Sequence, residues 1–176
     1  MTREQKFADA YDSYFRHVYA YCRRRTELDR VDDAVADTFL TAWRRIDAMP
    51  DGESALPWLY GVAFKVISHQ WRSSNRKQKL ERRLVSIGAP LQEAADHLVV
   101  HRDEIAQLMM AVSKLSDRDI EVLRLALWED LSTGAIGEAL GIPANTAKQR
   151  YHRARNRLIK EFERIQPTPA KRGGPA

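Results

Sequence analysis

The clearest binding chemistry in this sequence lies in the basic segment 144–165. On a helix with 100° between successive residues, its apolar residues share one side: Ala147, Tyr151, Ala154, Leu158, Phe162 and Ile165. The other side and its edges carry polar and cationic residues: Lys148, Gln149, Arg150, His152, Arg153, Arg155, Asn156 and Arg157. Such a face can hydrogen-bond base edges in a DNA major groove while its cations contact phosphates. A solvated surface helix is the alternative, although it would usually carry glutamate among its arginines.

A second set of candidate contacts lies on or just after the segment 57–72. Aromatic and basic residues are interleaved there, and the candidates are Tyr60, Lys65, His69, Arg72 and Arg76. Rings can stack on unpaired bases while cations hold the phosphate backbone, so the pattern predicts contact with single-stranded DNA. The two tryptophans of this segment follow the apolar spacing and are better explained as core residues.

Acidic residues gather earlier in the chain, at Glu27, Asp29, Asp32, Asp33 and Asp37. The whole chain carries a net charge of +5, so the segregation of its charges is more informative than their sum. An acidic helix is unsuited to DNA and predicts a basic partner. A solvated helix face is the alternative.

The sequence gives little support for catalysis, metal binding or membrane insertion. Cys22 is the only cysteine, and the sequence has no HExxH, P-loop or GxSxG motif. His97 and His101 are the only histidine pair at a metal-like spacing, and a zinc site there is a minor alternative. No run of 18 apolar residues and no N-terminal signal segment occurs. We therefore expect a cytoplasmic protein without enzyme activity, metal, cofactor or membrane insertion.

Helical periodicity accounts for most of the chain. Apolar residues recur at steps of three and four in the segments 7–21, 32–46, 57–71 and 105–115, and no useful strand pattern appears. We expect an all-α fold of two small helical domains joined by a flexible linker. The predicted boundaries are 1–78 for the N-terminal domain, 79–102 for the linker, 103–166 for the C-terminal domain and 167–176 for a disordered tail.

The C-terminal domain is predicted to contain a helix-turn-helix. Ser132 or Thr133 can cap a short helix, which Gly141 ends as a left-handed turn residue. Pro143 can begin the longer basic helix, which reaches about Ile165. A short helix, a glycine turn and a basic helix are together typical of DNA-binding helix-turn-helix domains.

Three sequence blocks, in this order and spacing, resemble the extracytoplasmic-function (ECF) sigma factors of bacterial RNA polymerase. They are DDAVADTFLTAW at 32–43, PWLYGVAFKVISHQWRSSNRK at 57–77, and LSDRDIEVLRLALWEDLSTGAIGEALGIPANTAKQRYHRARNRL at 115–158. The first is similar to the family's acidic helix, the second to its promoter-melting helix and the third to its helix-turn-helix domain. The resemblance covers nearly the whole chain except the tail.

The resemblance implies a protein that binds RNA polymerase core and directs promoter recognition, DNA melting and transcription initiation. Asp33 and Asp37 match family positions that face the coiled-coil helices of the large polymerase subunit. The N-terminal domain would recognise and open the minus-ten element. The C-terminal domain would read the minus-thirty-five element as duplex DNA, through positions that match Lys148, Gln149, His152 and Arg153. Family members are often held by an anti-sigma protein, which is a further expected partner.

One departure from the family pattern concerns promoter preference. Lys65 stands where the family usually has asparagine. Because lysine cannot accept a hydrogen bond, we expect an unusual base preference at the minus-ten element. A helix-turn-helix regulator that acts without polymerase core is the alternative function, and the aromatic-rich block 57–77 argues against it.

Overall fold

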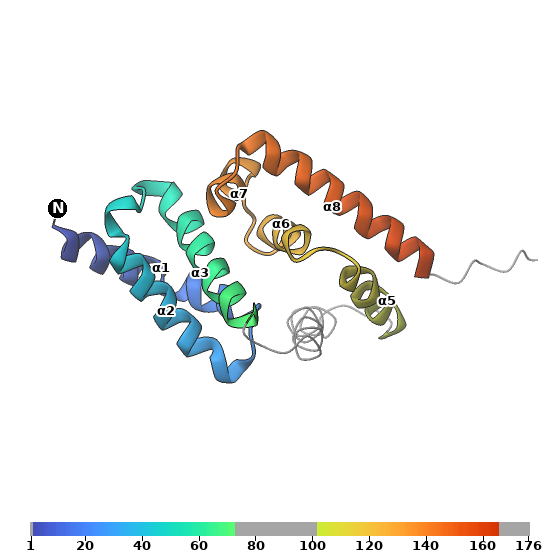
Figure 1. Ribbon diagram of the computed structural model, residues 1–176, viewed down its shortest axis with the longest axis horizontal. Helices are drawn as coiled ribbons and strands as arrows, with labels where there is room; N and C mark the ends of the chain where they lie inside the picture. Colours follow the sequence, from blue (N-terminus) through green and yellow to red (C-terminus); the bar gives the residue numbers. More distant parts are fainter. Residues whose placement is uncertain (1, 73–101, 166–176) are drawn as a thin grey trace, which may run out of the picture.

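The computed structural model describes residues 2–72 and 102–165, and every regular element in those two ranges is helical (Figure 1). This confirms the all-α prediction. Several predictions fall outside the described residues: the linker apart from its last residue, the tail 167–176, the contact Arg76, and the pair His97 and His101. No helix in the described ranges is long and apolar enough to cross a membrane.

The N-terminal half consists of the helices α1 (Arg3–Arg23), α2 (Val31–Arg44) and α3 (Ala55–Arg72), with 3-10 turns at Leu28–Arg30, Ile46–Ala48 and Gly52–Ser54. Helix α1 begins with a capping box between Thr2 and Gln5, which satisfies two backbone N–H groups at the helix start. The three helices bury the apolar stripes expected from the sequence, including Val18 of α1, Phe39 of α2 and Leu59 of α3. These stripes hold α3 in a fixed orientation against α1 and α2.

The C-terminal half consists of the helices α5 (Arg102–Ser113), α6 (Asp117–Leu127), α7 (Thr133–Leu140) and α8 (Ala144–Ile165). Ser132 caps α7 by accepting a hydrogen bond from a backbone N–H of the first turn. Gly141 ends α7 with a φ of 65°, in the left-handed region. The N–H groups of Gly141 and Ile142 donate to the carbonyls of Glu138 and Gly137, which forms a Schellman motif. The chain then turns into α8, and the predicted helix-turn-helix is confirmed.

The two halves pack against each other around one continuous core, which the sequence did not predict. Helix α3 lies against α7, and a single buried cluster includes Tyr21 from one half and Ile136 and Ala147 from the other (Figure 1). The close approach depends on Gly61 of α3, because a Cβ there would lie 2.1 Å from the carbonyl oxygen of Ala139 in α7. The helices fall into the two predicted domains. In this structure the two domains pack together around a shared core and form one body.

Candidate nucleic-acid interface

Helix α8 presents an exposed polar and cationic surface. Its apolar side, with Ala147 and Ala154 buried, packs against α5, α6 and α7. Six predicted residues on the outer side are exposed, and we call them the basic face: Lys148, Gln149, His152, Arg153, Arg155 and Asn156. Among the described residues, no acid forms an ion pair with Arg153 or Arg155. Their charge is therefore available to an external anion.

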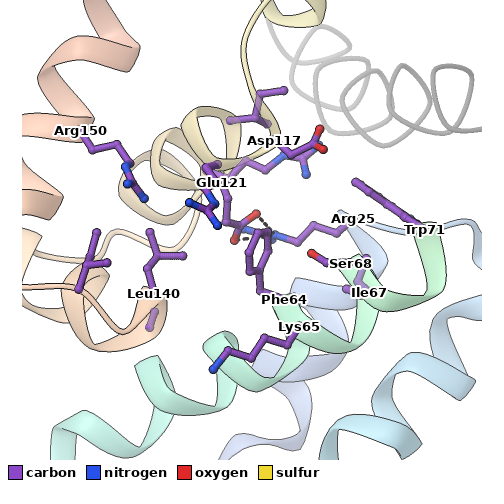
Figure 2. A pocket seen from close by; sticks show the side chains of 15 residues that line it. Arg25, Phe64, Lys65, Ile67, Ser68, Trp71, Asp117, Glu121, Leu140 and Arg150 are labelled. Carbon is purple, nitrogen blue, oxygen red and sulfur yellow. Dashed lines mark hydrogen bonds and ion pairs between the residues drawn. The ribbon is translucent and has the colours of Figure 1, made fainter. Parts of the chain in front are cut away.

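Two members of the predicted duplex-contact set, Arg150 and Arg157, are not part of the basic face. Arg150 is half-buried and extends from α8 toward a cavity between the two halves, apart from the basic face (Figure 2), and its contact with duplex DNA stays a prediction. It follows the buried Ala147 by three residues, which places it only about 60° from the buried side of the helix. Arg157 stays on the surface, but its guanidinium lies 3.3 Å from the carboxylate of Asp119. The basic face is therefore smaller than the sequence indicated.

The predicted single-strand contacts on α3 are only partly brought together. Lys65 and His69 are exposed and lie four residues apart, on one side of the helix. Arg72 is the last residue of α3, and Arg76 lies outside the described residues. The part of this surface that the structure describes is polar and cationic.

Tyr60 does not lie on the exposed surface of α3 in this structure, so its contact with single-stranded DNA stays a prediction. Its side chain is only 3% exposed, and its ring stacks on that of Tyr21 with the centroids 4.7 Å apart. Burial raises the pKa of the Tyr60 hydroxyl above its usual value, and the charge of Glu129 adds to the shift. Tyr60 shares the inner side of α3 with Phe64 and Ile67, and this spacing of four and seven residues could have revealed its burial.

Helix α2 exposes the three carboxylates Asp32, Asp33 and Asp37, which we call the acidic surface. Asp37 also accepts a hydrogen bond from Nε2 of Gln70 in α3, at 3.4 Å. Leu40, three residues further along the same helix, is 47% exposed. Because the carboxylates lie beside an exposed apolar side chain, this surface is suited to a basic protein partner rather than to DNA.

A cavity of about 480 Å³ lies between the two halves of the molecule (Figure 2). Aromatic surface comes from Phe64 and Trp71 of α3, and cationic groups come from Lys65, Arg118 and Arg150. Lys65 belongs to the predicted single-strand surface, whereas Arg150 was predicted to contact duplex DNA. Side chains expected at two different DNA elements therefore line the same space.

A buried group of charges joins the two halves beside this cavity, and it was not predicted from the sequence. Nε of Arg25 donates to Glu121 at 3.0 Å, and Nη1 donates to Glu129 at 2.8 Å. The exposed fractions of these three side chains are only 1%, 2% and 3%. The hydroxyl of Tyr21 also donates to Glu121, at 2.6 Å. We call these four residues the interdomain ion cluster.

The members of this cluster stabilise one another's charge and protonation state. Burial alone would lower the pKa of Arg25, but Glu121, Tyr21 and Glu129 together raise it by more, so the guanidinium stays charged. Burial raises the pKa of Tyr21 and keeps its hydroxyl protonated as a donor. One signal in the sequence was available: the apolar residues of α6 occupy more than one face, which is typical of a helix covered on two sides.

No site for metal or thiol chemistry appears in the part of the chain that the structure describes. Within residues 2–72 and 102–165, no three histidine, cysteine, aspartate or glutamate side chains are grouped so as to hold a metal ion. Cys22 is buried, and burial raises the pKa of its thiol to about 12. A thiol with such a pKa carries almost no thiolate at neutral pH and is a poor nucleophile.

Comparisons with protein families match both halves of the chain. The family model described as Sigma-70 region 2 matches residues 10–77. The model described as Sigma-70, region 4 matches residues 105–158. The first match covers most of α1 with all of α2 and α3, including the acidic surface and the Lys65 surface, and the second covers most of α5–α8, with the basic face. A regulator with only a DNA-binding domain in common with this family would lack the first match.

Individual relatives agree with these matches. The chain is 28% identical over 169 residues to the ECF RNA polymerase sigma factor SigW of Bacillus subtilis, covering 90% of each chain. It is 30% identical over 142 residues to the RNA polymerase sigma-E factor of Streptomyces avermitilis, covering 80% of this chain and 76% of that one.

Solved structures share the fold at lower identity. CnrH, in complex with the cytosolic domain of CnrY, matches with a TM-score of 0.60 at 19% identity over 91% of this chain and 89% of that one. The sigma factor RpoE from Bartonella quintana, in complex with the anti-sigma factor NepR, matches with a TM-score of 0.56 at 21% identity, over 89% and 96%. With both sigma regions present in order and a relative at 30% identity, the chain belongs to the ECF sigma factors of bacterial RNA polymerase.

Proposed function

We propose that this sigma factor reads the minus-thirty-five element with the basic face of α8, opens the minus-ten element with the outer surface of α3, and docks on polymerase core with the acidic surface of α2. The observation that carries the proposal is the segregation of exposed charge, with cations on α8 and carboxylates on α2. The protein acts by binding alone and catalyses no reaction of its own. It works in the bacterial cytoplasm, on the DNA of the nucleoid.

The duplex contact follows from the geometry of α8. Gln149 and Arg153 lie four residues apart at the centre of the basic face, where side chains reach base edges when a helix enters the major groove. Lys148 and Arg155 lie nearer the edges of that face, where they meet phosphates. Arg150 joins this contact only when the domains act as separate modules, because its side chain faces the interdomain cavity while they are packed together. Arg157 contributes to it only after releasing Asp119.

The single-strand contact rests on Lys65, His69 and Arg72, together with Arg76 in the following segment. Tyr60 is the remaining candidate of this set, and while it is buried the exposed part of the surface is cationic and polar. Melting also requires the capture of an unstacked base, and we place that capture near residues 47–56, which lead into α3 and include its first two residues. The loss of stacking is a few kcal/mol, which contacts to the flipped base and to the phosphates must offset.

The protein contacts follow from complementary charge. Asp33 and Asp37 are exposed on α2, and a basic helical surface on polymerase core, formed by the coiled-coil helices of its large subunit, is the partner we assign to them. An anti-sigma protein is a further proposed partner, because the RpoE relative was solved with one bound. The N-terminal domain 1–78 and the C-terminal domain 103–166 would then act as separate modules on either side of the linker 79–102.

Run-off transcription with purified core polymerase tests the proposal. On a library of promoter fragments, transcripts should appear only when this protein is present. The variant Arg153→Ala should lose transcripts that depend on the minus-thirty-five element, while Arg164→Ala, on the same helix beyond the basic face, should keep them. Confirmed binding to core without initiation on any promoter would refute the proposed function.

A further inference from the structure

We propose that Lys6 of α1 is a positioning residue for the capture of the unstacked base, because it holds the segment 46–54 in one conformation before DNA binds. The inference deepens the proposed function and rests on it, since that function places base capture near residues 47–56. The side chains that hold the segment come from helix α1, about 40 positions earlier in the chain.

The segment 46–54 has little regular structure of its own. It joins α2 to α3 through two short 3-10 turns, Ile46–Ala48 and Gly52–Ser54. Ordering a flexible segment on binding costs conformational entropy, and this cost adds to the loss of stacking when a base is flipped. A segment that is already ordered in the free protein avoids the additional cost. Contacts that fix its shape therefore favour capture.

The first support is the position of the Lys6 ammonium group. Its Nζ donates to the main-chain carbonyl of Met49 at 2.6 Å and lies 2.8 Å from the carboxylate of Asp51. The Lys6 side chain is only 19% exposed, whereas lysine is mostly exposed in proteins. Asp51 is 80% exposed, so the ion pair alone contributes little. The bond to Met49 matters more, because that residue is buried and a buried carbonyl without a donor is costly.

The second support is a small apolar cluster that anchors the same segment to α1. Ile46 and Met49 are buried together with Ala10 of α1, and Tyr14 packs against them. The hydroxyl of Tyr14 also donates to the carbonyl of Gly52, at 3.5 Å. Helix α1 therefore contacts both 3-10 turns of the segment, through apolar and polar groups together.

The third support is that these contacts leave the outer side of the segment uncovered. Asp51, Gly52 and Glu53 are all exposed. Gly52 has a φ of 65°, in the region that favours glycine, and a Cβ there would meet no atom within 4 Å. A base can therefore approach the segment closely while α1 holds its inner side. Lys6 acts through the segment and not on the base itself.

Hydrogen exchange in the free full-length protein tests the positioning directly. The amide of Met49 donates to the carbonyl of Ile46 in the first 3-10 turn, so its exchange reports local opening. In Lys6→Met this amide should exchange about tenfold faster, as expected when a bond from a charged donor is lost. The matched control Arg16→Met removes an equal charge from an exposed position of α1 and should leave the exchange unchanged. Unchanged exchange in Lys6→Met would overturn the proposal.

Binding of a minus-ten single strand to the complex with core polymerase tests the consequence for capture. An abasic site is placed at each position in turn, and the one that weakens binding of the parent most marks the captured base. On the intact strand Lys6→Met should bind about tenfold more weakly. On the strand that is abasic at the captured position, it should bind as the parent does. The slope of log affinity against log salt should stay the same, because no phosphate contact is lost.

Two further variants keep this test decisive. Lys6→Arg retains a charged donor and should restore binding of the intact strand. If circular dichroism shows that Lys6→Met does not fold, Lys6→Gln, which is uncharged and one atom shorter, takes its place with the same expected results. Equal losses on the intact and abasic strands, or a lower salt slope, would overturn the proposal, because Lys6 would then act on the phosphates or on the whole fold.

Failure of this inference and failure of the proposed function give different results. If no abasic site weakened binding of the parent, base capture itself would be refuted, and the role of Lys6 with it. If the parent captured a base and Lys6→Met bound the intact strand equally well, only the positioning role would be refuted, and the proposed function would stand.

Discussion

The interdomain ion cluster and the basic face of α8 differ in how their charges are compensated. In the interdomain ion cluster, Arg25 is enclosed by Glu121 and Glu129, and every charge has its partner inside the chain. On the basic face of α8, cations such as Arg153 and Arg155 are exposed, and no acid among the described residues forms an ion pair with them. The difference indicates that the buried charges stabilise the packing of the two halves, whereas the exposed charges can bind another molecule. Substitutions in the first region should impair folding, and substitutions in the second should impair binding.

The largest effect should come from the buried cluster. Replacing Glu121 by Leu leaves Arg25 buried with one of its two carboxylates missing and leaves the Tyr21 hydroxyl without its acceptor. Breaking a buried pair from one side usually costs about 3–5 kcal/mol. We expect the free energy of unfolding, measured by urea titration, to fall by about this amount.

The matched control for this substitution is a pair on the surface. Arg3 and Asp47 approach to 3.5 Å, but their side chains are 52% and 73% exposed. Because exposed pairs contribute only about 0–1 kcal/mol, Asp47→Asn should hardly change the unfolding midpoint. If Glu121→Leu and Asp47→Asn lowered the free energy of unfolding equally, the distinction between buried and exposed ion pairs in this molecule would be refuted.

The next largest effect should come from reversing the acidic surface. The double variant Asp33→Lys with Asp37→Lys places two cations opposite a basic partner, and like charges across an interface cost several kcal/mol. We expect binding to core polymerase to fall below detection in a pull-down, while the urea midpoint stays near that of the parent. The double variant Asp9→Lys with Asp12→Lys makes the same change of charge on exposed positions of α1 and should bind normally. Core affinity retained by the first variant would remove α2 from the interface.

Local features of the fold could be predicted from the sequence because a few adjacent residues determine them. Ser132 caps α7 as the sequence indicated, and Gly141 adopts the left-handed conformation that its position requires. The side of α8 that carries Ala147 and Ala154 is buried as its periodicity predicted. Each of these features depends on residues within one or two helical turns.

The contact between the domains could not be predicted in the same way. Tyr21 and Glu121 are 100 positions apart, so no spacing in the sequence relates them. Arg25 lies in a polar, charged stretch that looks like an exposed loop, although its side chain is only 1% exposed. The unexpected placements of Tyr60 and Arg150 have the same origin, because Tyr60 belongs to the core shared by both domains and Arg150 lines the cavity between them. Periodicity shows which side of a helix is apolar but not which second element covers it.

A smaller effect is expected at the centre of the basic face. Arg153→Ala should weaken binding to a minus-thirty-five duplex by about 1–3 kcal/mol, as for an arginine that contacts a base edge, and should reduce discrimination between sequences. Arg164→Ala on the same helix removes an equal charge, but that side chain pairs with Glu161 beyond the proposed contact, so it should bind as the parent does. Fluorescence anisotropy of a labelled duplex measures both. Equal losses from the two variants would mean that α8 attracts DNA only by its net charge.

The smallest effect is expected at Lys65, which is exposed at the mouth of the interdomain cavity rather than at the centre of a recognition face. In the complex with core polymerase, Lys65→Ala should weaken binding of a minus-ten single strand about equally for all sequences. It should also lower the slope of log affinity against log salt by about 1, because one phosphate contact is lost. Lys114→Ala, an exposed lysine of the C-terminal domain, should leave that slope unchanged. A change in base preference without a change in slope would instead make Lys65 a base-reading residue.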